Sequence, residues 1–200
     1  MPNPNPHHRV PLVAVGDAWI VIAIIVVLFF PFGFGGGTSL PRFNAPSDGE
    51  PFTNGAGATI LVSPKWQAAE DVENDGWSAP GYEGVAKATV AISTYPEKVP
   101  RQPLAEFAAE AVKELVDSVS ATDMAIVEQG DIALTDGRTG YRVRYTYRSV
   151  LGTQEAGVAI VAAKGRSAAI ARMWGSQDNM DDVVSRLNEP YLRTIVQPAG

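Results

Sequence analysis

An apolar run near the amino terminus constrains this chain more than any other feature. No charged residue occurs from Ala18 to Gly37, and apolar residues are densest from Trp19 to Phe34. A helix over those 16 residues would rise about 24 Å, against about 30 Å for the hydrocarbon core of a bilayer. Extension toward Pro11 gives ample length. We therefore expect a transmembrane helix over 11–34 and a cytoplasmic tail over 1–10.

A cleaved secretory signal is the alternative interpretation of this run. The apolar part of a signal peptide normally has about 7–15 residues and ends at a cleavage site with small residues. Here the run is longer and ends in "FFPFGFGGG", which is aromatic and glycine-rich. These features favour an anchor that stays in the mature protein. Arg9 before the run favours a cytoplasmic amino terminus and an extracytoplasmic carboxy-terminal domain.

Asp17, just before the run, and Trp19, near its start, are candidate partner-binding residues. Asp17 can lie at the level of the lipid headgroups beside Trp19, as interfacial residues do. Alternatively it lies within the hydrocarbon core, where an isolated acid is costly and needs a basic partner on a neighbouring helix. The second arrangement would make the chain a subunit of a complex.

The composition excludes several classes of function. From Ala58 onward the chain has 14 Lys and Arg against 19 Asp and Glu, so nucleic acid is not an expected partner. Cysteine is absent, and histidine occurs only at His7 and His8. The remaining residues cannot build a Ser-His-Asp triad, a thiolate nucleophile or an H-E-x-x-H zinc site. We expect no enzymatic activity, no cofactor and no metal.

Between the apolar run and the carboxy-terminal part, the composition is that of a linker. Residues 33–57 contain seven Gly and three Pro. This predicts a flexible Gly/Pro linker over 35–57, with the folded domain at 58–200. Phe43 and Phe52 have an alternative role, which is to dock onto a partner surface.

The domain shows strand patterns grouped apart from two helical patterns. Alternating or apolar runs predict strands at 58–63, 85–94, 124–129, 132–134, 140–150, 155–165 and 167–175. The "KGR" at 164–166 indicates a hairpin. A stripe with a 3.6-residue period predicts a helix over 103–119, with Pro103 in its first turn. A second helix is expected from about 178, capped by Asp178 or Asn179 and interrupted at Pro190. This order predicts the α+β class, with one antiparallel sheet and two main helices packed on it.

The segment "ILVSPKW" at 60–66, taken with this element order, resembles the Mog1/PsbP-like fold. Members of that group often begin with a strand that runs into a proline and a tryptophan, here Pro64 and Trp66. In actinobacteria, similar LpqN/LpqT-like domains are exported as lipoproteins or membrane-tethered proteins. This chain differs because it has no lipid-modified cysteine and carries an apolar run instead. The resemblance implies a fold with binding or assembly roles, and it implies no reaction.

The acidic stretch "EDVENDG" at 70–76 resembles the first half of a calcium loop. Asp71, Glu73 and Asp75 alternate and precede Gly76, as the first ligands of an EF-hand do. Tyr82 occupies the position of the closing carboxylate, and no helical pattern flanks the stretch. We therefore interpret it as a solvated acidic loop.

The strand segment "YRVRYTYR" at 141–148 is the strongest candidate for a binding surface. Strand alternation places Tyr141, Val143, Tyr145 and Tyr147 on one face, which is expected to pack beneath a helix. The opposite face carries Arg142, Arg144, Thr146 and Arg148. Such an arginine row suits anionic lipid headgroups, a carboxylate ligand or an acidic partner patch, or else it is a solvated face.

Two tryptophans complete the candidate partner-binding residues. Trp66, Trp77 and Tyr82 lie around a loop of Gly, Pro and acidic residues, where they either line a pocket mouth or pack in the core. Taken together, these features predict a non-catalytic accessory subunit of a membrane complex, in contact with other membrane subunits and the bilayer. The alternative is a tethered carrier of a lipid or a small anionic ligand in the gap between helices and sheet.

Overall fold

The computed structural model describes residues 43–69, 76–81, 86–95, 102–180 and 182–196. The chain divides into two compact units, Met1–Ser39 and Leu40–Gly200, and the described residues belong to the second. The expected membrane helix, with Asp17 and Trp19, lies outside them, as do Tyr82 and the three acids of the calcium-like loop. No helix within the described ranges has the length and hydropathy to cross a membrane.

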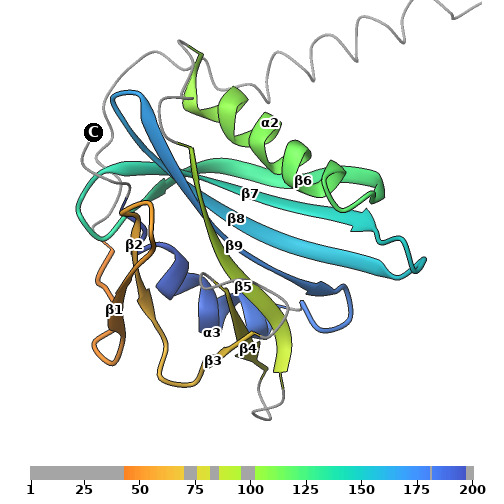
Figure 1. Ribbon diagram of the computed structural model, residues 1–200, viewed down its shortest axis with the longest axis horizontal. Coiled ribbons are helices and arrows are strands. Elements are labelled where there is room, and N and C mark those ends of the chain that lie inside the picture. Colours follow the sequence, from red (N-terminus) through yellow and green to blue (C-terminus); the bar gives the residue numbers. More distant parts are fainter. Residues whose placement is uncertain (1–42, 70–75, 82–85, 96–101, 181, 197–200) are drawn as a thin grey trace, which may run out of the picture. The chain divides into compact units, whose positions relative to one another are not determined.

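One antiparallel sheet of seven strands forms the centre of the domain (Figure 1). Its spatial order is β3-β4-β5-β9-β8-β7-β6. The strands are β3 (Gln67–Ala68), β4 (Gly76–Pro80), β5 (Ala86–Tyr95), β6 (Thr122–Ala133), β7 (Thr139–Arg148), β8 (Gln154–Lys164) and β9 (Ser167–Ser176). The α+β prediction is confirmed. The two strands expected at 124–129 and 132–134 are a single strand, β6, because pairing with β7 continues through Gly130 and Asp131.

The hairpin expected at "KGR" joins β8 to β9. Lys164 pairs with Ser167, which leaves a two-residue turn of Gly165 and Arg166. Gly165 has φ = +59°, the left-handed region that this kind of turn requires at its first position. This hairpin fixes the register of the two central strands.

Helix α2 (Leu104–Asp117) covers one face of the sheet. Its apolar stripe buries Phe107, Ala108, Ala111, Val112 and Val116, as its sequence period predicts. These side chains pack against the inward residues of β7, β8 and β9, among them Val143, Tyr145 and Ile170. Pro103 was expected in the first turn but is the N-cap, with φ −54° and ψ 145°. A proline here fits because the cap residue is not helical.

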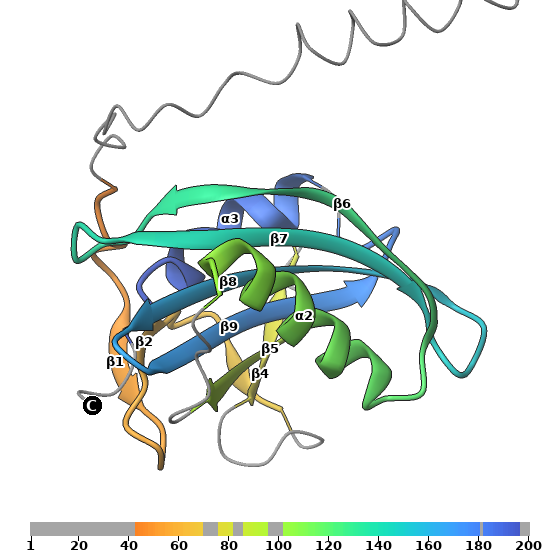
Figure 2. The ribbon, with the colours of Figure 1, turned by 90° about the horizontal axis from the view of Figure 1, so that it is seen from above.

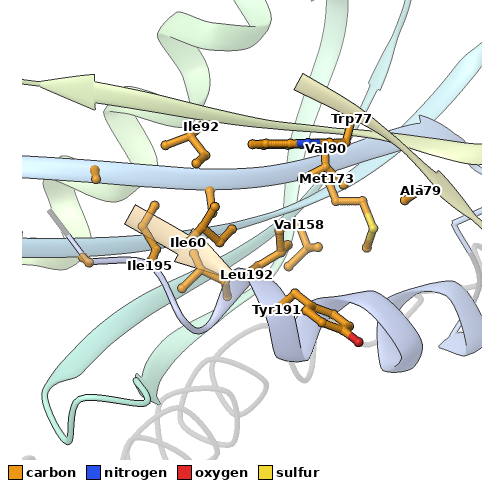
Figure 3. Close-up of a cluster of buried hydrophobic side chains, with 14 of the residues drawn as sticks. Ile60, Trp77, Ala79, Val90, Ile92, Val158, Met173, Tyr191, Leu192 and Ile195 are labelled. Carbon is orange, nitrogen blue, oxygen red and sulfur yellow. The ribbon is translucent and has the colours of Figure 1, made fainter. Parts of the chain in front are cut away.

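Helix α3 (Asp182–Leu192) lies on the opposite face, so the sheet is covered on both sides (Figure 2). Figure 3 shows Leu192 and Ile195 with Ile60 facing sheet residues such as Val158 and Met173. The helix begins later than the expected position near 178. Asp178 and Asn179 do not cap it; they lie in a turn where the Asn179 N–H donates to the Ser176 carbonyl. Pro190 lies inside the helix.

A hairpin of β1 (Glu50–Thr53) and β2 (Thr59–Val62) packs beside α3. The linker prediction for 35–57 is therefore wrong over its described part, and the folded domain includes residues before Ala58. The physical reason is that the turn between β1 and β2 itself requires polar residues and glycine, the same composition that predicted a linker. The buried Asn54 Oδ1 accepts hydrogen bonds from the N–H of Ala56 (3.2 Å) and Ala58 (2.9 Å), and Gly57 has φ = +85°.

Candidate functional site

A groove between α3 and the outer strands β6 and β7 contains most of the predicted arginine row. We call it the arginine groove; it has a volume of about 430 Å³ and is lined by Glu128, Arg142, Arg144, Arg186, Glu189, Pro190 and Arg193. Strands β6 and β7 supply the floor, and α3 with the residue after it supplies the wall. The domain as a whole is acidic, so this concentration of guanidinium groups is a local exception.

Two periodicities bring these side chains together. Alternation along β7 places Arg142 and Arg144 on the face away from α2, as predicted, because Val143 and Tyr145 are buried beneath that helix. On the other wall, Arg186, Glu189 and Arg193 are separated by three and four residues, which places them on one side of a helix. Sequence reasoning missed Arg186 and Arg193. Their spacing was the available signal, but nothing local indicates that this side of α3 meets β7.

Ion pairs hold the floor of the groove in place. Arg142 pairs with Glu128 and also with Glu189, where Nη1 and Oε1 are 3.4 Å apart. Arg144 lies 3.6 Å from the second oxygen of Glu128. Glu128 thus serves both arginines of β7. Among the described residues that line the groove, there are four guanidinium groups and two carboxylates, so arginines outnumber acids in this lining.

Arg193 anchors the wall of the groove to neighbouring segments. Its Nε and Nη2 both donate to the Ala133 carbonyl, at 3.0 and 2.8 Å. The guanidinium carbon lies 3.7 Å from the centre of the Phe43 ring. Burial lowers the pKa of Arg193, the charge of Glu189 raises it, and the charge of Arg142 lowers it further. The last effect agrees with the presence of both Arg142 and Arg193 in the lining of the same groove.

The third predicted arginine of the row, Arg148, does not belong to this groove. It lies at the opposite end of β7, where Nε donates to Asp123 Oδ2 (3.3 Å) and Nη1 donates to the Gly152 carbonyl (3.1 Å). It lies six positions along the strand from Arg142, or about 20 Å. The predicted row therefore divides into two arginines that line the groove and one outside it.

Trp66 and Trp77 are core residues rather than the rim of a pocket. Their exposed fractions are 6% and 8%. The Trp66 Nε1–H donates to Asn188 Oδ1 at 2.8 Å, and its ring lies 5.3 Å from that of Tyr191. Phe52 packs edge-on against Trp77, at 4.8 Å between ring centres. Phe52 therefore packs within the chain, and the alternative that it docks onto a partner is not supported.

A second surface feature is apolar and lies at the far end of β7. Among described residues, six large apolar side chains are exposed, and five of them lie in or beside the last turn of α2, the first half of β6 and the β7–β8 connection. These are Val119, Ile126, Val127, Val150 and Leu151. We call Val119, Val150 and Leu151 the apolar end, because Ile126 and Val127 lie further along β6, where Ile126 pairs with Tyr145 in the middle of β7. Val119 and Val150 border a groove of about 500 Å³ that Tyr147 and Trp174 also line. Sequence reasoning did not identify this surface.

Metal binding finds no support within the described ranges, where no group of three or more His, Cys, Asp or Glu residues is arranged to hold an ion. The calcium-like loop at 70–76 lies outside those ranges except for Gly76, which begins β4.

Comparison with known proteins identifies the fold. No protein-family model and no curated protein matches this sequence. Among solved structures, the Ran-binding protein Mog1p of Saccharomyces cerevisiae is similar, with a TM-score of 0.55 and 9% identity over 74% of this chain and 95% of that one. Cyanobacterial PsbP (CyanoP) from Synechocystis has a TM-score of 0.51 and 12% identity over 84% of this chain and 99% of that one. The fold is thus Mog1/PsbP-like, as the sequence resemblance implied.

Proposed function

We propose that this chain is a single-pass, membrane-anchored extracytoplasmic protein that binds partner subunits and performs no chemistry itself. The uncharged run from Ala18 to Gly37 supports the anchor. The absence of cysteine, and of histidine beyond His8, supports a binding role. The resemblance of "ILVSPKW" to exported actinobacterial LpqN/LpqT-like proteins supports a place in a respiratory or cell-envelope assembly. Mog1p, which shares the fold, is itself a Ran-binding protein.

The apolar end is the observation that carries this proposal. Val150 is 69% exposed and Leu151 is 88% exposed, and Val119 beside them is 51% exposed. Single exposed apolar side chains are ordinary, but several at one end of a sheet, with Val119 and Val150 bordering a groove, are typical of a protein interface. Full burial of a Val or Leu side chain contributes about 1.5–3 kcal/mol, so a partner that covers this end gains substantial binding energy.

The geometry of β6 indicates how such a partner would bind. β6 is the outer strand of the described sheet, and its pairing with β7 shifts register between Thr122 and Ala125 and between Ile126 and Glu128. The consecutive residues Ile126 and Val127, at the second irregularity, are both exposed. A bulged edge hinders the addition of another strand. We therefore expect the partner to cover this edge with side chains rather than with a paired strand.

A second candidate function, carriage of a small anionic ligand, is favoured by the arginine groove. The site proposed from sequence, the gap between helices and sheet, is occupied by the side chains of the two core clusters. A carrier would therefore hold its ligand at the groove surface. Mass spectrometry of the purified protein would reveal such a ligand, and Arg142→Ala with Arg144→Ala would reduce its retention.

The accessory-subunit proposal is tested by co-purification of the full chain from membranes dissolved in a mild detergent. We expect a defined set of membrane proteins to co-purify with the native chain. Val150→Asp with Leu151→Asp should reduce their recovery at least tenfold. Leu187→Asp is the matched control, because Leu187 is 49% exposed but lies on α3. Equal recovery with all three chains, or mature protein found free and trimmed near Gly37, would contradict the proposal.

A further inference from the structure

We infer that the arginine groove binds the phosphodiester headgroups of anionic lipids in the membrane that anchors the chain. The inference rests on the proposed anchoring and names the ligand of a site that the anchoring brings to the bilayer surface. Three observations carry it: the place where the chain joins the domain, the length of the preceding segment, and the charge of the groove.

The chain joins the described part of the domain directly beside the groove. The ring of Phe43, the first described residue, lies 3.7 Å from the Arg193 guanidinium, and Arg193 lines the groove. Tyr191 holds the same segment a few residues later, through a hydrogen bond of 2.7 Å to Asp48. The first contact places Phe43 beside the groove, and the second holds the residues that follow it against α3.

The segment that precedes Phe43 is short. The expected membrane helix ends at Phe34, so only residues 35–42 separate it from the domain. Eight residues span at most about 28 Å when fully extended. A tether of this length keeps the groove close to the lipid headgroups, whereas the linker expected from the sequence, which reached residue 57, would have allowed far greater separation.

The charge and chemistry of the groove suit a lipid phosphate. Guanidinium groups bind phosphate oxygens through paired N–H donors, and four of them face two carboxylates here. Residues 58–200 carry a net negative charge, so most of the domain surface is repelled by an anionic bilayer. The groove is then the part of the surface that the bilayer attracts. This orientation directs the apolar end, about 20 Å further along β7, away from the lipid.

Arginine footprinting on the full chain tests this inference. The chain is reconstituted in vesicles of phosphatidylcholine alone or of phosphatidylcholine with phosphatidylglycerol, treated with phenylglyoxal and analysed by mass spectrometry. We expect phosphatidylglycerol to reduce modification of Arg142, Arg144, Arg186 and Arg193 at least threefold. Arg148 and Arg138, which pair with Asp123 and Asp136 elsewhere, are internal controls and should not change. An equal decrease at the controls would overturn the inference.

Two further arms identify the source of the phosphate and the reason for any failure. Inorganic phosphate added to neutral vesicles should give no protection; protection equal to that by phosphatidylglycerol would assign the groove to a soluble anion instead. Arg144→Gln with Arg186→Gln should abolish the lipid effect at Arg142, and Arg148→Gln should not. Release of the chain by a high-salt carbonate wash would overturn the anchoring itself. Retention after the wash without protection would overturn only the lipid site.

Discussion

The hydroxyl of Tyr191 in α3 donates a hydrogen bond of 2.7 Å to Oδ1 of Asp48, which lies two residues before β1. The contact joins parts of the chain separated by 143 residues. Between them, Gly49 packs so closely that an added Cβ would lie 2.9 Å from the Leu61 Cβ and 3.3 Å from the Tyr191 ring. The residues just before β1 are therefore packed closely against α3 and β2.

Tyr191→Phe should lower the free energy of unfolding by about 1–2 kcal/mol, because it removes this hydrogen bond and the one with the Ser63 side chain but keeps the ring. The ring contact with Trp66 is expected to persist, since it does not involve the hydroxyl. Urea unfolding of a chain that begins at Leu40 would measure the change. Asp48→Asn, which keeps an acceptor oxygen, should cost less. A larger loss for Asp48→Asn than for Tyr191→Phe would contradict this account.

A chain that begins at Ala58 should melt about 10 °C below one that begins at Leu40. The shorter chain lacks β1, so Trp77 loses the Phe52 ring and Tyr191 loses Asp48. Burial of one Phe side chain contributes about 2 kcal/mol and the hydrogen bond about 1 kcal/mol. For a domain of this size, 1 kcal/mol corresponds to about 2–4 °C. Thermal unfolding followed by circular dichroism measures both chains, and identical melting temperatures would restore the linker interpretation.

Gly157→Ala should destabilise the domain by about 2 kcal/mol, because an added methyl group overpacks a buried cross-strand pair. Gly157 lies opposite Tyr145 in the sheet, and its Cβ would stand 2.5 Å from Cζ of that ring. Tyr145 is 2% exposed and has no room to move aside. Gly130→Ala is the control, since no atom lies within 4 Å of its Cβ position. Chemical denaturation should show little change for the control, and equal losses would rule out the steric cause.

Stability should fall as the pH rises above 10. Burial, aided by the charge of Glu155, raises the pKa of Tyr147 to about 12, and burial also raises the pKa of Tyr145. Below pH 10 these tyrosines are protonated in both states and have no effect. Above pH 10 these tyrosines ionise first in the unfolded chain. Each tyrosine therefore lowers the free energy of unfolding by up to about 1.4 kcal/mol per pH unit. Urea midpoints between pH 8 and 11.5 test this, and Tyr147→Phe should give a shallower decline.

Local patterns were sufficient to predict the sheet and the two faces of β7. The alternation in "YRVRYTYR" correctly places Val143 and Tyr145 beneath α2 and directs Arg142 and Arg144 to the other side. These predictions succeeded because strand and helix periodicities depend on neighbouring residues only. The fold resemblance implied by "ILVSPKW" is likewise confirmed by the similarity to the two solved structures.

Features that depend on distant contacts were not predictable in the same way. The Gly and Pro content before Ala58 indicated a linker, because the pairing of Phe52 with Ile60 and its packing on Trp77 are invisible in local composition. Arg186 and Arg193 join the groove only because α3 packs beside β7. The exposure of Val150 and Leu151 also depends on the complete fold. In the sequence, two apolar residues beside a turn look the same whether their side chains are buried or exposed.

The bridge between Thr59 and Val196 has a mechanical consequence. Their backbones exchange two hydrogen bonds of 2.8 Å, and the Leu61 N–H donates to Thr194 Oγ1 at 2.7 Å. A pull transmitted along the chain from its amino-terminal side would therefore load the β1–β2 hairpin and the end of α3 before it strained the seven-stranded sheet. These few hydrogen bonds would break first. The surfaces formed by β6 and β7 would keep their structure under a force that had already begun to separate β1 from the domain.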